Sequence, residues 1–250
     1  MKQTFLILCL LIASFTKGQI VFEPIRGGAM PGGGGIMQEI NVYGADMLGK
    51  RMTYAQIKGN PYLDTLFKPA ALYDFRGKTY GKFMARLNLY TNEVHFLNKQ
   101  GEEMVADKGA VKTVAFFTRD TTDIITSIYE CGYQSPKDPE AKNDYYQVLN
   151  LGDAQLLKAT RKFINQYDSQ IIYKRYRFLK TETYYISYKG QLYKLNRLSK
   201  DQVLSCLPSD ETSQDWLIAK ENKMRKEEEI TAFLDYYNTR RGNNIKLQFE

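Results

Sequence analysis

The chain has 250 residues and a formal net charge of +7, with 35 lysines and arginines, 28 acidic residues, three cysteines and one histidine. This length fits one domain, or one domain with a small helical appendix. After residue 19, no apolar run approaches the roughly 20 residues of a membrane-spanning helix. The sequence contains no nucleophile-elbow, zinc-protease, Walker or EF-hand motif, which argues against the commonest catalytic and metal-dependent classes.

The first 18 residues have the order of a secretory signal peptide. Lys2 gives a positive start, residues 5–12 (FLILCLLI) are apolar, and small and polar residues then lead to Gln19. The apolar core of such a peptide is about 7–15 residues long, too short to span a bilayer. We expect cleavage near Gly18 and a mature protein in the periplasm, outside the cell or on its surface, without a transmembrane segment.

Residues 19–35 predict a flexible leader. They include four successive glycines at 32–35, and such a stretch loses much backbone entropy on ordering. A phosphate-binding loop is the alternative, but the Gly-Lys-Ser/Thr ending and a flanking strand and helix are missing.

Residues 36–198 predict an antiparallel β domain. The clearest pattern is at 79–90, where Phe83, Ala85, Leu87 and Leu89 alternate with polar residues, as in a strand with one buried face. Residues 134–143 (QSPKDPEAKN) predict an exposed loop without an apolar anchor. The main predicted strands are 52–57, 71–75, 79–90, 93–97, 111–117, 124–129, 145–149, 154–164, 171–179, 183–188 and 191–195.

Residues 199–250 predict two or three α-helices packed on this domain. Ser199 and Gln202 have the spacing of a capping box, and Pro208 ends the helix that follows. Residues 227–237 place apolar side chains at helical spacing, so one face is suited to docking. These side chains are Ile230, Phe233, Leu234 and Tyr237. The predicted fold class is therefore α+β: a mostly antiparallel meander, curved or barrel-like, followed by C-terminal helices.

The basic residues are concentrated in one segment. Residues 158–200 contain eleven lysines and arginines against Asp168 and Glu182, a net charge of +9. Tyrosines are interleaved with them, which favours a binding surface for an acidic envelope protein, an anionic surface or an acidic polysaccharide. Nucleic acid is not expected as a partner of an exported protein. The residues of this candidate surface are Tyr173, Lys174, Arg175, Tyr176, Arg177, Tyr185, Lys194 and Arg197.

Two simpler interpretations stand beside that one. The basic segment also fits a solvated sheet face whose lysines prevent pairing of exposed strand edges. The 19 tyrosines and 13 phenylalanines fit ordinary sheet faces as well as an aromatic platform for glycans or other flat ligands.

Cysteine and histidine supply little further chemistry. Cys131 and Cys206 remain after cleavage and form either a disulfide or two separate thiols; no metal site or cofactor is predicted. Alternation places His95 opposite Val94 and Phe96, as a surface or edge residue of a strand. A pair of catalytic carboxylates remains possible in principle, with Asp144, Asp153 and Asp168 as candidates.

Several segments give the chain an overall resemblance to a group of exported proteins of Bacteroidetes-type bacteria. The signal peptide ends at Gln19, and a C-terminal helix ends at residues 234–238 (LDYYN). The internal segments are residues 59–63 (GNPYL), 86–96 (RLNLYTNEVHF) and 145–158 (YYQVLNLGDAQLLK). The resemblance covers most of residues 55–240 and implies an envelope location and one folding unit. It implies no activity.

Three functions follow as hypotheses. The first is a non-enzymatic envelope protein that binds through the basic, tyrosine-rich surface at 171–197. The second is a carrier or sensor for a small apolar ligand, with walls from residues 83–89 and Phe233. The third is a glycan hydrolase that depends on two carboxylates.

Overall fold

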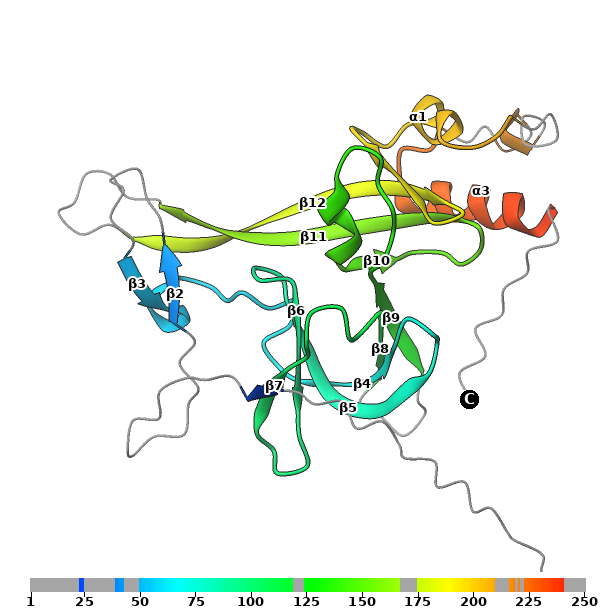
Figure 1. The fold of residues 1–250 in the computed structure, drawn as a ribbon. Coiled ribbons are helices and arrows are strands. Elements are labelled where there is room, and N and C mark those ends of the chain that lie inside the picture. The colour runs from blue at the N-terminus through cyan, green and yellow to red at the C-terminus, as the bar shows by residue number, and fades with distance from the viewer. Residues whose placement is uncertain are drawn as a thin grey trace, which may run out of the picture.

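A computed structural model describes residues 53–118, 124–166, 175–209, 216–218, 220 and 223–240, and the backbone alone of 23–24, 39–42 and 50–52. Its main feature is one curved antiparallel sheet, with helices at one end (Figure 1). The strands of this sheet are β1 (Glu23–Pro24), β4 (Lys68–Tyr73), β5 (Thr79–Asn88), β6 (Glu93–Leu97), β7 (Glu103–Val105), β8 (Thr113–Phe117), β9 (Ile125–Glu130), β10 (Tyr146–Val148), β11 (Ala154–Gln166), β12 (Tyr176–Tyr188) and β13 (Gln191–Leu195).

The strand order is β1-β7-β6-β5-β4-β8-β9-β10-β11-β12-β13. Two meanders, β4 to β7 and β8 to β13, are joined where β8 pairs with β4. A second sheet consists of β2 (Glu39–Val42) and β3 (Lys50–Thr53), and a 3-10 helix, η1 (Tyr54–Gln56), follows β3. The predicted α+β fold with an antiparallel meander is confirmed. Residues 1–18 of the predicted signal peptide lie outside the described residues, and in the predicted leader only β1 is described.

The alternation in β5 builds one part of the core. Ala85, Leu87 and Leu89 are buried, and Phe83 packs against the same cluster. Val94 and Phe96 of β6 join that cluster from the neighbouring strand. The period-two pattern thus identified the buried face of this meander.

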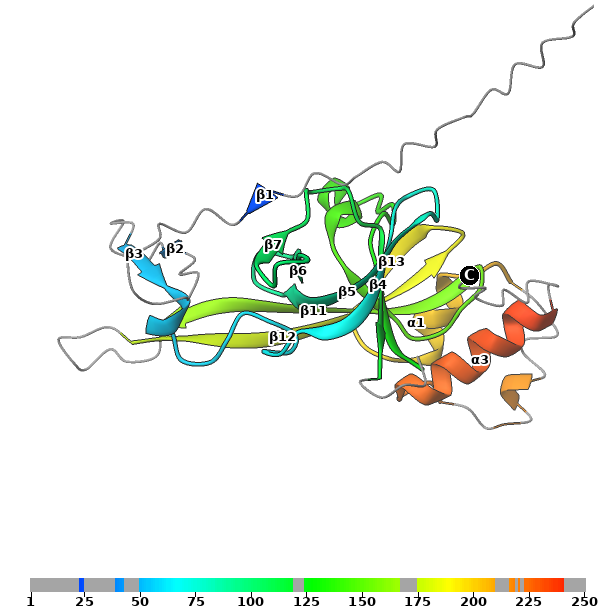
Figure 2. The same ribbon diagram turned by 90° about the horizontal axis from the view of Figure 1, so that it is seen from below.

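The longest hairpin pairs β11 with β12 over 13 residues of each strand. The sequence analysis predicted two separate strands, 171–179 and 183–188, with residues 180–182 between them. Instead β12 continues through Thr181 and Glu182, whose side chains are exposed while their backbone stays paired with β11. The hairpin extends well beyond the strands next to it (Figures 1 and 2).

The curvature of the sheet brings this hairpin back towards β5. The Lys162 backbone N–H donates to the Leu89 carbonyl at 3.0 Å. The Lys58 N–H donates to the Tyr176 carbonyl at 2.9 Å, and the Phe178 N–H returns a bond to the Lys58 carbonyl at 3.0 Å. The segment before β4 therefore links the β11–β12 hairpin to the region of β5, and so closes the curl of the sheet.

Two helices cover the other end of the hairpin. α1 (Lys200–Ser205) and α3 (Glu227–Arg240) pack on it, and the side chains predicted for docking in α3 are all buried, which confirms that face. The predicted capping box at α1 is wrong in detail. Ser199 makes no capping bond, because Gln202 accepts the backbone N–H groups of Asn196 and Arg197 instead. Among the described residues, every helix is too short or too polar to cross a lipid bilayer.

One amide side chain fastens α3 to the start of β11. Asn238 is buried; its Oδ1 accepts the Ala154 N–H at 2.9 Å, and its Nδ2 donates to the Ala154 and Leu151 carbonyls at 2.8 and 3.0 Å. Gly152 lies directly beneath it, and a Cβ at that position would lie 2.3 Å from Asn238 Nδ2. The glycine therefore leaves the space that the amide occupies.

Replacing Asn238 by alanine should lower the free energy of unfolding by about 1–3 kcal/mol, because it leaves the buried N–H of Ala154 without its partner. Chemical denaturation of wild-type and N238A proteins measures this difference. Asn196→Ala is the matched control, since Asn196 is exposed and its loss should change stability by less than about 0.5 kcal/mol. Equal stability of N238A and wild type would show that the amide does not fasten the helix.

Candidate functional site

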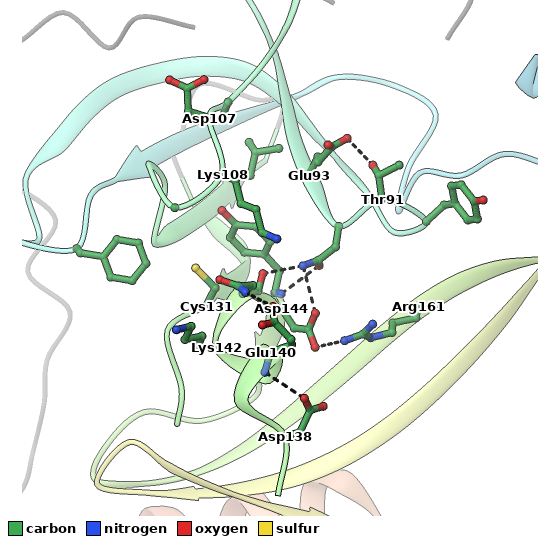
Figure 3. A pocket seen from close by; sticks show the side chains of 18 residues that line it. Thr91, Glu93, Asp107, Lys108, Cys131, Asp138, Glu140, Lys142, Asp144 and Arg161 are labelled. Atoms are coloured by element: carbon green, nitrogen blue, oxygen red, sulfur yellow. Dashed lines mark hydrogen bonds and ion pairs between the residues drawn. The ribbon is translucent and has the colours of Figure 1, made fainter. Parts of the chain in front are cut away.

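A cavity of about 420 Å³ lies where the two meanders meet (Figure 3). Its walls come from the start of β6, the β7–β8 loop, the end of β9, the 3-10 helix η2 (Pro139–Asn143) and β11. This volume falls within the usual range of about 300–1,000 Å³ for small-molecule sites. The cavity is the candidate functional site.

The deepest residues of the cavity are small or apolar, and its thiol and one of its phenols stay protonated. Val94, Ala106 and Cys131 are buried there. Burial raises the pKa of the Cys131 thiol to about 11, so the thiol stays protonated and is a poor nucleophile at neutral pH. Burial also raises the pKa of Tyr145, whose hydroxyl donates to the Val111 carbonyl at 2.5 Å.

One wall is the loop that contains η2. The sequence predicted this loop as wholly exposed, but Ala141 is buried and its carbonyl accepts the Tyr146 hydroxyl at 3.2 Å. The Asp138 carboxylate accepts the Glu140 N–H at 3.1 Å and caps the 3-10 helix. This small apolar anchor and this cap hold the polar loop against the sheet.

A second wall is organised by Asn92. With φ at 60°, it turns the chain between β5 and β6 in the left-handed region that asparagine tolerates. Its Nδ2 donates to the Asn143 carbonyl at 2.7 Å, and its Oδ1 accepts the Tyr145 N–H at 3.2 Å. Asp144 lies beside it in an ion pair with Arg161 of β11 (Figure 3). The turn, the η2 loop and the hairpin are thereby fixed to one another.

A chain of charged side chains runs from the cavity, where Glu93 is partly exposed, to the buried His95 in the sheet. Glu93 lines the cavity and accepts the Thr91 hydroxyl at 2.5 Å. Its Oε2 lies 3.8 Å from His95 Nε2, an ion-pair distance and too long for a hydrogen bond. On the other side, His95 Nδ1 lies 2.7 Å from Glu103 Oε1, which also accepts Arg86 Nη2 at 2.6 Å.

The prediction of a surface or edge histidine is therefore wrong. His95 does lie on the face opposite Val94 and Phe96, but it is 0 % exposed. Tyr62 covers it edge-on at 5.5 Å between ring centroids, and Arg86 stacks on the same tyrosine. The alternation of β6 correctly placed His95 on the face opposite Val94 and Phe96. That face is buried because the segment before β4 covers it.

The charges in this chain stabilise one another. His95 and the Thr91 hydroxyl hold the pKa of Glu93 below its ordinary value, against the opposing effect of burial. Burial lowers the pKa of His95, but the Glu103 and Glu93 carboxylates outweigh it and raise that pKa above 6.5. Burial likewise opposes, but does not cancel, the lowering of the Glu103 pKa by His95 and Arg86.

Three charged side chains of the rim remain uncommitted. Asp107, Lys108 and Lys142 are exposed and make no hydrogen bond or ion pair with another described residue. Lys108 is turned towards the middle of the cavity, whereas the Asp107 carboxylate points away from it (Figure 3). No group of three or more His, Cys, Asp or Glu side chains in the described part of the chain is arranged to hold a metal ion.

Two of the eight residues predicted for the basic surface, Tyr173 and Lys174, lie outside the described residues. Tyr176 is buried in a cluster with Ile57. Tyr185 packs edge-on against Tyr146, with ring centroids 5.2 Å apart. Tyr176 is therefore a core residue, and Tyr185 is half-buried against the η2 loop.

The remaining four are exposed but far apart. Arg175 and Arg177 lie at one end of β12, whereas Lys194 pairs with Tyr185 and Arg197 follows β13. Arg177 and Tyr185 are eight residues apart along one strand, about 26 Å. The structure thus spreads these residues along the hairpin rather than gathering them into one patch.

At least four of the eleven basic residues of this segment are engaged within the described part of the molecule. Three of the cations on β11 and β12 are held in ion pairs. Another, Lys162, donates to carbonyls of the segment before β4, and burial lowers its pKa. The ion pairs are Lys158–Glu227, Arg161–Asp144 and Lys180–Glu182.

Packing bears on two further alternatives from the sequence, the disulfide and the walls of a carrier. Cys131 and Cys206 are free thiols, and they pack in different parts of the sheet: Cys131 beneath the cavity and Cys206 among the helices. The apolar walls expected for a carrier do not face each other. Leu87 belongs to the cluster of the first meander, whereas Phe233 is buried in the cluster under α3.

Sequence reasoning missed the residues that line the cavity. Thr91 and Asn92 fall between two predicted strands, and nothing in their sequence context distinguishes Lys108 and Lys142 from other surface lysines. Asp144 was named as a candidate carboxylate, and it does line the cavity, in its ion pair with Arg161. Comparison of the chain with protein-family models, curated protein sequences and solved structures finds no match.

The buried histidine predicts a pH-dependent stability. Its folded pKa is raised, so its stabilising effect is complete below about pH 6.5 and is lost as the pH rises through the higher folded value. The difference in unfolding free energy between wild type and His95→Gln should therefore shrink from about pH 6 to about pH 9, as measured by denaturation at each pH.

Glu103→Gln provides the control, because it removes the strongest favourable partner of the imidazolium. In the E103Q protein, the loss of unfolding free energy caused by His95→Gln should depend much less on pH. Parallel pH profiles for wild type and H95Q would contradict a stabilising charge on His95.

Proposed function

We propose that this chain is an exported, non-enzymatic envelope protein that binds a hydrophilic ligand in the polar cavity. Export is supported by the signal-like first 18 residues and by the resemblance to exported proteins. The observation that carries the binding proposal is a cavity of about 420 Å³ with a charged rim, two of whose lysines, Lys108 and Lys142, make no hydrogen bond or ion pair with another described residue. Lysines on an ordinary surface do not lie around a cavity. Ligand sites, in contrast, combine apolar surface with a few polar groups directed at the ligand.

The cavity fits binding better than hydrolysis. A glycosidase needs a carboxyl group with a raised pKa as its proton donor. Glu93 is the cavity carboxyl whose pKa is lowered, which keeps it ionised. Asp144 is engaged by Arg161 and Asn92, so its oxygens serve to hold the walls together.

The cavity is also a better candidate binding site than the basic surface predicted from sequence. That surface required its arginines, lysines and tyrosines to lie together, and they are spread along β12 and β13. The partner that we propose therefore contacts the junction of the two meanders, with an anionic surface or acidic partner along the hairpin as the competing possibility.

Native mass spectrometry of the mature protein, purified gently from its own host, tests the proposal. We expect a discrete added mass on the wild-type protein. The double variant K108A/K142A should lower its occupancy at least about tenfold, since each hydrogen bond from a charged group contributes about 1.5–3 kcal/mol.

The matched control is K194A/R197A, which removes two exposed cations of the predicted basic surface. This variant should keep the added mass. Loss of the mass in K194A/R197A, with K108A/K142A unaffected, would place the contact on the hairpin and contradict the proposal. A bare wild-type mass, or a protein complex that survives K108A/K142A, would contradict it as well.

A further inference from the structure

We infer that the ligand of the cavity is a short saccharide, and that its chain extends from the cavity onto the exposed face of the β11–β12 hairpin beside Arg161. This inference rests on the proposed function and names the ligand class and a second subsite. The argument begins with the chemistry of the rim.

The rim carries donors and acceptors side by side. Lys108 and Lys142 present donors and Glu93 presents a carboxylate acceptor, beside the Arg161–Asp144 ion pair of the wall. A sugar hydroxyl both donates and accepts, so a polyhydroxylated ring meets both kinds of group at once. A ligand of one charge sign would meet repulsion from part of this rim, and an apolar ligand would leave these groups without partners.

Aromatic and apolar groups of the cavity match the other face of a sugar. Tyr90 and Phe75 line its sides, and Val94 and Ala106 lie in its floor. Sugar rings present C–H groups on their faces, and these pack against the electron-rich faces of aromatic rings. A cavity of about 420 Å³ is at the small end of ligand sites, which suits about two sugar units.

The second subsite lies on the hairpin. Arg161 closes one side of the cavity, and Phe163 follows it on the same face of β11, about 7 Å further along the strand. Phe163 is 42 % exposed, although it is a large apolar side chain, and it pairs across the hairpin with Leu179. The η2 loop covers the same face nearer the helices, where Leu157 and Tyr185 are packed against Tyr146 and Ala141.

The exposed ring therefore stands next to the cavity, just beyond the point where the covering loop ends. A saccharide longer than the cavity would leave it past Arg161 and lay its next unit on Phe163. Thr181, which pairs with Arg161, offers a hydroxyl on the same face. The extension thus combines a flat apolar surface with polar edges, as sugar stacking requires.

An array of immobilised oligosaccharides of two to six units, with neutral, amino-sugar and uronate members, provides the test. Wild type, K108A/K142A, F163A and M84A are compared, and the strongest binder is titrated by calorimetry. Met84 is the matched control, since it is also an exposed apolar side chain on a strand, at 40 % exposure.

We expect wild type to bind at least one series more tightly as its length increases from two to four units. F163A should bind the longer members about five- to tenfold more weakly and the disaccharide as wild type does, whereas M84A should change neither. K108A/K142A should weaken all lengths. Circular dichroism of each variant checks that it is folded.

Failure of the inference is distinguishable from failure of the proposed function. A discrete added mass in native mass spectrometry without any saccharide binding on the array would overturn the ligand class and leave the proposed function standing. If F163A weakened the binding of every oligosaccharide length equally, or weakened none of them, the hairpin subsite would be overturned. Release of new reducing ends from a bound oligosaccharide would overturn the non-enzymatic role itself.

Discussion

The structure depends on the contact that closes the curl of the sheet. In strand order, β5 and β11 are separated by β4, β8, β9 and β10, yet a backbone hydrogen bond joins Lys162 of β11 to Leu89 just after β5. The Lys162 ammonium donates to the Asn60 and Tyr62 carbonyls at 2.9 and 2.6 Å, and so fixes the segment before β4 in the same place. Because this contact brings the two meanders together, loops far apart in sequence can form one cavity.

The segment before β4 also explains why the charged side chains around His95 are tolerated inside the sheet. A buried charge is acceptable only when other groups compensate it. His95 lies between two carboxylates, and Arg86 satisfies Glu103 while donating to the Thr65 carbonyl at 3.0 Å. Tyr62 packs against His95 and Arg86, and the imidazole is fully buried. Since Glu93 is both the outer member of this chain and part of the cavity, the charge that a ligand meets there is set by the buried histidine.

Local patterns were enough to predict much of the fold, because strands and helices reveal their buried faces through spacing. The alternation of Ala85 and Leu87 and the helical spacing of Ile230 and Phe233 both identified core faces. The burial of His95 was not predictable in this way, since it depends on a covering segment whose Gly59-Asn60-Pro61 reads only as a turn. The cavity escaped prediction for the same reason: its residues share no spacing and meet only through strand pairing.

The long hairpin has a different role from the one that its charge indicated. Its cations are used largely within the molecule: Lys158 pairs with Glu227 at the start of α3, and Arg161 pairs with Asp144 at the cavity. The first pair holds the helices and the second holds the η2 loop, so these two basic residues fix β11 to the parts of the fold on either side of it. What remains available on the face beside the cavity is Phe163, an apolar ring. A segment that reads in sequence as an electrostatic surface thus offers, in three dimensions, a rigid support for a stacked ligand.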